Sequence, residues 1–144
     1  MSSALLLILL LPTLAAAQGT KPEAPGLGRI TGQLIYPSDY FPDNMRVTAI
    51  SVADKGRSYS TTRTQSKRYS LRLPAGDYYV YATTGDMPGY RAYYTNFVTC
   101  GLTYGCLSHT KIVVHVQAGT ILARIDPEDW YEPARPTAAD SVKQ

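Results

Sequence analysis

Apolar and polar residues alternate with a period of two through the middle of the chain, the pattern of β-strands that bury one face and expose the other. Residues 68–73 show it most clearly, because every second residue from Tyr69 onward is apolar. The alternation continues over residues 77–83, after the turn sequence Pro74-Ala75-Gly76. We therefore predict a β-hairpin here. Gly76 is expected to adopt a positive φ, because a reversal this short favours a residue without a Cβ.

Other segments repeat the alternation between clusters of Gly, Pro, Asn and Asp. No window shows the period of an amphipathic helix. Seven or eight short strands, with a turn about every ten residues, predict a single all-β domain, either an antiparallel sandwich or a barrel. The Ser/Thr-rich segment 57–64 is the expected edge strand. The remaining strands are expected over residues 29–36, 45–52, 91–99, 112–116 and 121–125.

The N-terminus has the features of a signal peptide. The apolar run 4–11 is too short to span a bilayer, which takes about 20 residues, and Ala15-x-Ala17 supplies the small residues needed for cleavage. We expect a secreted or periplasmic protein that begins near Gln18 and keeps no transmembrane segment. The expected organisation is a signal peptide at 1–17, a flexible linker at 18–28, a β-sandwich domain at 29–132 and a polar tail at 133–144.

Cys100 and Cys106 are the two cysteines of the chain, and an even number in an exported protein favours a disulfide. Gly101 and Gly105 allow the loop between them to turn sharply. In the chain-entropy model a loop this short gains about 2 kcal/mol from the bond. Metal binding by the pair is disfavoured, because such sites need further ligands and the chain has no third cysteine.

One segment says more than the general β pattern. Residues 69–82 read YSLRLPAGDYYVYA and resemble the signature of carboxypeptidase regulatory-like domains. The strands expected near 30–34 and 42–49 are similar to that family as well, so the resemblance covers residues 29–125. It implies a prealbumin-like, antiparallel Greek-key sandwich, and it implies little about activity, because the family consists mostly of accessory modules. The cysteine loop and residues 125–133 are similar to uncharacterised exported bacterial proteins with this fold.

Aromatic and basic side chains on the two strands of the expected hairpin are the first candidates for binding. Tyr79 and Tyr81 alternate with core positions, and Arg68 and Arg72 point outward on the preceding strand. A flat face bearing Tyr and Arg can stack on sugar rings or pack against a protein. The alternatives are that loops cover these tyrosines, or that they reflect the high frequency of Tyr in β-strands.

The C-terminal segment combines aromatic and acidic residues. Trp130 and Tyr131 are expected to hold this segment against the sandwich, with a ligand platform as the alternative. The nearby carboxylates could supply oxygen ligands to calcium, but their spacing fits no known calcium loop. A solvated turn is therefore expected, with no metal ion. The carboxylates are Asp126, Glu128, Asp129 and Glu132.

Two histidines are the candidates for acid–base catalysis. His115 falls on the solvent-facing side of its strand, and His109 lies in the loop after Cys106, beside Ser108. No motif for an activated nucleophile or an oxyanion hole accompanies either histidine. We therefore expect no catalytic residue and no cofactor.

These patterns favour an exported, non-enzymatic module that binds carbohydrate, a cell-wall polymer or a protein at the cell envelope. One alternative is a small secreted hydrolase that uses His109 with the C-terminal carboxylates. A second is an assembly subunit that polymerises through its edge strand, 57–64. Nucleic acid is not an expected partner, because a net charge of +3 lacks the concentrated basic surface that such binding requires.

Overall fold

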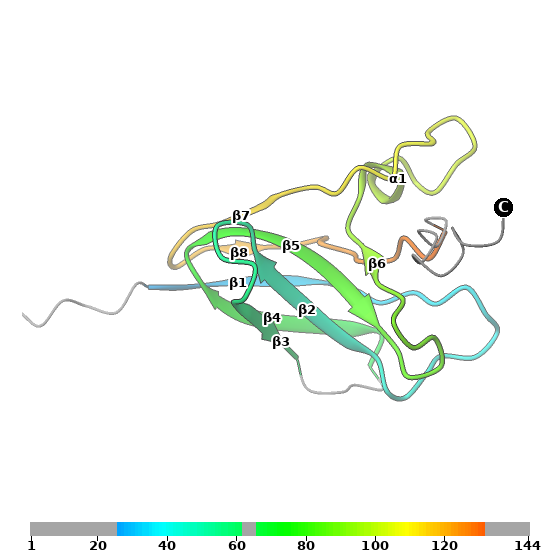
Figure 1. Cartoon of the computed structure of the whole chain (residues 1–144), viewed down its shortest axis with the longest axis horizontal. Coiled ribbons are helices and arrows are strands. Elements are labelled where there is room, and N and C mark those ends of the chain that lie inside the picture. Colours follow the sequence, from blue (N-terminus) through cyan, green and yellow to red (C-terminus); the bar gives the residue numbers. More distant parts are fainter. Residues whose placement is uncertain (1–25, 62–65, 132–144) are drawn as a thin grey trace, which may run out of the picture.

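The computed structural model describes residues 26–61 and 66–131, which form two β-sheets packed face to face (Figure 1). The predicted all-β architecture is confirmed at this level. One sheet has the order β4-β1-β8, and the other has the order β3-β2-β5-β6, with β7 also paired to β5. The elements are β1 (Leu27–Gln33), β2 (Arg46–Ser51), β3 (Ser58–Ser60), β4 (Arg68–Pro74), β5 (Gly76–Thr83), β6 (Ala92–Tyr93), α1 (Asn96–Thr99), β7 (Val114–Val116) and β8 (Ile121–Leu122).

Most strand pairs are antiparallel, as predicted, but the pair at one edge is not. β1 pairs with β4 along its whole length in the antiparallel sense. β1 also pairs with β8, and this ladder is parallel, with Arg29 opposite Ile121. β2 pairs with one edge of β5. On the opposite edge, β7 pairs with the first residues of β5 and β6 pairs with residues near its end, so two short strands share that edge. The prediction of a fully antiparallel fold is therefore wrong at β8.

The inner faces of the two sheets form one apolar core. The predicted alternation is confirmed, because Tyr69 of β4 and Tyr78 of β5 are buried with every second residue that follows them. The sequence did not decide which face of β2 points inward. The structure buries Val47 and Ala49 completely. Each large apolar side chain that leaves water favours the folded state by about 1.5–3 kcal/mol. Fully enclosed core residues include Ile30, Leu34, Met45, Leu73, Val80 and Ala92.

The turn after β4 does not form the predicted hairpin. β4 pairs with β1 and β5 pairs with β2, so residues 74–76 carry the chain from one sheet to the other. Gly76 has a φ of +156°, which confirms its special backbone conformation. The Tyr78 hydroxyl donates a hydrogen bond of 2.9 Å to the Pro74 carbonyl and holds the bend. A Pro-x-Gly sequence suits a hairpin and an arch between sheets equally well, so the partners of each strand decide which one forms.

The strand predicted over 91–99 is also shorter than expected. Only Ala92–Tyr93 pairs as β6, and the helical turn α1 follows it. Gly101 has a φ of +81°, and its backbone N–H donates to the Val98 carbonyl at 2.9 Å, which ends the helix. This turn directs the chain into the loop between the two cysteines.

At the C-terminal side, β8 contains two residues of the predicted strand 121–125. Ile121 is 67% exposed, whereas Ile125 is buried, so these two residues do not share the predicted inward face. The reason is Arg124, whose φ of +60° breaks the extended conformation and turns the chain inward. β3 lies at the edge of its sheet, as predicted for segment 57–64, of which residues 62–64 lie outside the described residues.

The N-terminal boundary of the domain lies earlier than predicted. β1 begins at Leu27, inside the segment 18–28 that was expected to be a flexible linker. Gly28 is buried there, and a Cβ at this position would lie 2.4 Å from the Gln117 carbonyl oxygen, so only glycine fits. The predicted signal peptide and polar tail lie outside the described residues. Within residues 26–61 and 66–131, no helix is long and apolar enough to cross a membrane.

Replacing Gly76 with Val tests the arch between β4 and β5. A φ of +156° strains a residue with a branched Cβ, so we expect the free energy of unfolding to fall by about 1–3 kcal/mol. Thermal and urea melts measure the change. Gly105→Val is the matched control, because an added Cβ there meets nothing within 4 Å. Gly26 is unsuitable, because its added Cβ would lie 2.8 Å from that of Ala118. Equal stability of Gly76→Val and the parent would contradict the positive φ at Gly76.

Candidate functional site

The two halves of the predicted binding face lie on opposite sides of the sandwich. Tyr79 and Tyr81 are on the outer face of the five-stranded sheet, because their neighbours on β5 point into the core. Arg68 and Arg72 are exposed on β4, which belongs to the three-stranded sheet. The predicted combination is therefore wrong. It depended on a hairpin between β4 and β5, and that hairpin does not exist.

In the structure, Tyr79 and Tyr81 lie beside residues other than the predicted Arg68 and Arg72. Tyr93 of β6 is the direct partner of Tyr81 in the ladder, and the centroids of the two rings are 5.1 Å apart. The Arg91 guanidinium lies over the Tyr81 ring, 4.9 Å from its centroid. The Lys111 ammonium lies over the Tyr93 ring at 3.8 Å. We call these five residues, three tyrosines and two cations, the tyrosine face.

Burial shows which groups of the tyrosine face meet solvent. Tyr81 is only 8% exposed, whereas Tyr79 and Tyr93 are half-buried and Arg91 is exposed. A hydrogen bond to Tyr93 and the nearby Tyr81 raise the already high pKa of Arg91, so this side chain stays positively charged. Tyr81 therefore supports the surface from below, and the surface itself presents Arg91, Lys111 and the edges of two tyrosines.

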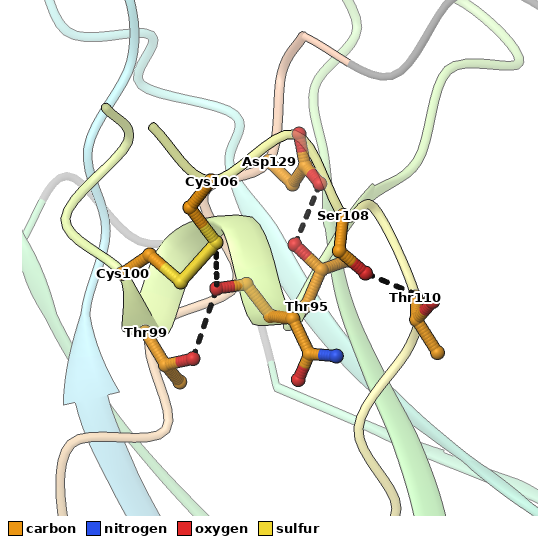
Figure 2. Close-up of a disulfide and its surroundings, with 8 residues drawn as sticks. Thr95, Thr99, Cys100, Cys106, Ser108, Thr110 and Asp129 are labelled. Carbon is orange, nitrogen blue, oxygen red and sulfur yellow. Dashed lines mark hydrogen bonds between the residues drawn. A yellow bond between two sulfur atoms is a disulfide. The ribbon is translucent and has the colours of Figure 1, made fainter. Parts of the chain in front are cut away.

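A second cluster lies where the cysteine loop meets the C-terminal segment. Asp129 is fully buried, and its carboxylate accepts hydrogen bonds from the Thr95 hydroxyl at 2.6 Å and from Nδ1 of His109 at 2.8 Å. Figure 2 shows the bond between Thr95 and Asp129 beside the disulfide. We call Thr95, His109 and Asp129 the histidine cluster. The expected solvated turn is wrong for Asp129, because a buried carboxylate needs partners and here it has them.

The histidine cluster fixes one orientation of the His109 ring. The carboxylate can only accept, so Nδ1 of His109 carries the shared proton and Nε2 faces away from Asp129. The Phe97 ring packs against the imidazole, with centroids 4.8 Å apart. The neighbouring Ser108 hydroxyl bonds to Thr110 at 3.1 Å (Figure 2), so it is not directed at His109 as a nucleophile. His115, by contrast, is exposed as predicted and pairs with Asp77 at 2.6 Å.

The predicted disulfide is confirmed by the geometry of the loop. Cys100 and Cys106 are bonded, with their Cα atoms 6.1 Å apart, and Figure 2 shows the bond at the end of α1. Tyr104 at the tip of the loop is 99% exposed. The bond therefore closes a loop that projects from the sandwich next to the histidine cluster.

Trp130 and Tyr131 have different environments. Trp130 is buried, and its indole N–H donates to the Ile35 carbonyl at 2.7 Å, which confirms that it holds the C-terminal segment against the sandwich. It packs against the rings of Tyr36 and Tyr90 and leaves no open platform. Tyr131 is 54% exposed, and its ring lies edge-to-face with that of Phe97, with 6.0 Å between ring centroids.

Among the described carboxylates of the C-terminal segment, which do not include Glu132, Glu128 has a buried oxygen, Oε2, without a hydrogen-bond partner in the described part of the chain. Burial, and then the nearby Asp126, raise the pKa of Glu128 to about 7. Asp126 itself accepts a hydrogen bond of 2.6 Å from the Gln33 backbone N–H. Among the described residues, no group of three or more His, Cys, Asp or Glu side chains is arranged to hold a metal ion.

Glu128 makes the stability of the domain dependent on pH. The folded state holds this proton up to about pH 7, whereas the unfolded chain releases it near 4.5, so stability falls as the pH rises between these values. The full shift corresponds to roughly 3 kcal/mol, and partial exposure reduces it to about 1–2 kcal/mol. We expect Glu128→Gln to stabilise the protein by that amount at pH 8 and hardly at all at pH 4. Urea unfolding at both pH values measures this, and a gain of equal size at both would contradict it.

The disulfide gives a separate prediction. In the exported protein, non-reducing peptide mapping should recover Cys100 and Cys106 in one linked fragment. Replacing both with Ser should lower the free energy of unfolding by about 2 kcal/mol, because the unfolded chain gains the freedom of the open loop. Thr103→Ser, inside the same loop, is the control and should change little. Two thiols that react with an alkylating agent in unreduced protein would contradict the pairing.

Comparison with known proteins adds no assignment to these two clusters. No family model matches the chain, and no curated protein matches it. The resemblance to carboxypeptidase regulatory-like domains therefore stays a prediction from the sequence. The function of this protein has to be argued from the tyrosine face and the histidine cluster themselves.

Proposed function

We propose that this protein is an exported, non-enzymatic β-sandwich module that binds a carbohydrate or related polymer of the cell envelope through its tyrosine face. The observation that supports the proposal is the contiguity of Tyr79, Tyr81 and Tyr93 on one outer sheet face, with Arg91 and Lys111 on top of two of the rings. Sugars present both C–H faces and hydroxyl groups. Tyrosines and basic side chains offer matching ring edges, hydroxyls and hydrogen-bond donors.

The rigidity of the tyrosine face favours binding. Tyr79 and Tyr81 belong to the central strand β5, which pairs with β2 on one side and with β6 and β7 on the other. Side chains on such a strand lose little further freedom when a ligand arrives, so less of the interaction energy is spent on ordering them. A protein partner remains a second ligand class for this same face.

Export is supported by two features of the chain. The N-terminal apolar run with Ala15-x-Ala17 has the form of a signal peptide, and the pair Cys100–Cys106 is bonded as in oxidising compartments. A module that leaves the cytoplasm meets the polymers of the envelope first, so the proposed ligand class and the proposed location agree.

Affinity electrophoresis of the mature protein in gels that contain envelope polysaccharide tests the proposal. We expect the polymer to retard the parent protein, and expect Tyr79→Ser combined with Tyr93→Ser to weaken binding at least about tenfold, because stacking of a tyrosine contributes on the order of 1 kcal/mol or more. Tyr104→Ser is the control, since Tyr104 is 99% exposed and lies outside the tyrosine face. Retardation that the double variant retains in full would refute the proposal.

A hydrolase is the second candidate, because the structure does bring His109 together with a C-terminal carboxylate. The buried Asp129 orients the imidazole at 2.8 Å, which is how many hydrolases prepare a general base. The missing part is a nucleophile, since the Ser108 hydroxyl is bonded to Thr110. Assays with activated esters and glycosides decide the matter. Turnover that disappears in His109→Gln would favour the hydrolase over the binding module.

Assembly through an edge strand is the weaker alternative. β3 lies at the edge of the five-stranded sheet, but within the described residues it covers three positions, Ser58–Ser60. Short and polar edges are one way in which proteins avoid adding strands from other molecules. Size-exclusion chromatography of the mature protein separates a monomer from a concentration-dependent polymer.

A further inference from the structure

Arg91 and Lys111 are two cations that lie over adjacent rings of the tyrosine face. Each lies over its own tyrosine, at 4.9 and 3.8 Å from the centroid, and the two ring centroids are 5.1 Å apart. Neighbouring like charges repel one another, and the attraction of each cation to an aromatic face opposes that repulsion and fixes both side chains.

Neither cation has an acidic partner in the described part of the chain, where no carboxylate oxygen lies within 4.0 Å of either side chain. Two of the described carboxylates have other partners, since Asp129 is buried with Thr95 and His109, and Asp77 pairs with His115. The guanidinium of Arg91 carries five N–H donors and the ammonium of Lys111 three, so both retain donors for a ligand.

The position of Lys111 is set by the backbone and is not left to a free loop. Lys111 forms an isolated bridge with Thr95. On one side of it, the Ile112 N–H donates to the Tyr94 carbonyl at 3.1 Å. On the other side, the Thr110 carbonyl accepts from the Asn96 N–H at 3.0 Å. The segment that carries Lys111 is thus fastened to the segment that carries Tyr93. The two cations are arranged before any ligand arrives, which lowers the cost of binding.

From this arrangement we infer that Arg91 and Lys111 form an oxyanion-binding site, and that the polymer recognised by the tyrosine face is acidic. The inference rests on the proposed function and narrows its ligand class. The shared chemistry is a carboxylate or phosphate group carried on a chain rich in hydroxyls. The oxyanion accepts hydrogen bonds from both cations, and the adjacent sugar or polyol unit lies against Tyr79 and Tyr93.

Titration calorimetry at low salt, with an acidic sugar polymer, its neutral ester and a phosphate polymer, tests the inference. Polygalacturonate supplies the carboxylate, its fully methyl-esterified form is the matched neutral polymer, and poly(glycerol phosphate) supplies the phosphate. We expect at least one acidic polymer to bind more than about tenfold more tightly than the neutral ester, and expect binding to weaken as salt rises, because ions screen the attraction. The tighter of the two acidic polymers identifies the preferred oxyanion.

Two variants assign the binding to this site. Arg91→Gln with Lys111→Gln should lower the affinity for the acidic polymer more than about tenfold and should reduce its dependence on salt. Arg68→Gln with Arg72→Gln is the matched control, because it also removes two positive charges, from exposed arginines on the opposite sheet. A circular-dichroism melt of each variant verifies that it is folded. An equal loss in this control would mean general charge attraction and would overturn the inference.

The remaining outcomes separate this inference from the proposed function. If the neutral ester binds as tightly as polygalacturonate, and the tyrosine double variant abolishes that binding, the tyrosine face stands and the oxyanion site is refuted. If no polymer binds the parent protein, both the proposed function and the oxyanion site are refuted.

Discussion

The chain crosses from one sheet of the sandwich to the other between β4 and β5, and the inner faces of both strands contribute to the one core. The two strands follow one another in sequence, yet they belong to different sheets. Residues 74–76 make this possible with a glycine at φ +156° and a hydrogen bond from the Tyr78 hydroxyl to Pro74. Because the chain crosses between the sheets here, the outward residues of β4 and β5 face opposite directions. This one crossing decides which side chains can act together at the surface.

The C-terminal segment completes the packing. Tyr69 of β4 donates a hydrogen bond to the Ile125 carbonyl at 2.5 Å. Trp130 donates one to the carbonyl of Ile35, which follows β1, so the segment is bonded to two parts of the sandwich. Asp129 continues the same segment into the histidine cluster. A carboxylate in this position costs free energy unless hydrogen bonds compensate for the lost water. Asp129 has these bonds, and Glu128, one residue before it, has an unpartnered oxygen.

Two neighbouring clusters therefore use their charges in different ways. In the histidine cluster the buried carboxylate of Asp129 points inward and accepts hydrogen bonds from Thr95 and His109. The tyrosine face is outward and unpaired, since its cations lie on aromatic rings and meet no acid among the described residues. The backbone joins them, as Tyr93 forms a bridge with Asp129 and Thr95 forms one with Lys111. Only the outward cluster offers charge to a ligand, and for this reason it supports the proposed binding function.

The sequence by itself determined the local properties of this protein. Period-two alternation was sufficient to find β4 and β5 and their buried faces, the loop glycines and cysteine count were sufficient for the disulfide, and a Pro-x-Gly turn was sufficient for the conformation of Gly76. The tertiary structure alone decided which strands pair, that β8 runs parallel to β1, and that Arg91 and Lys111 replace Arg68 and Arg72 beside the tyrosines. It also brought His109 to Asp129, 20 residues away. The physical reason is that alternation reports only which face of a segment avoids water. Which strand lies next to that segment depends on contacts between distant parts of the chain and on irregular loops. Such loops have no repeating pattern of apolar and polar residues from which their structure could be predicted.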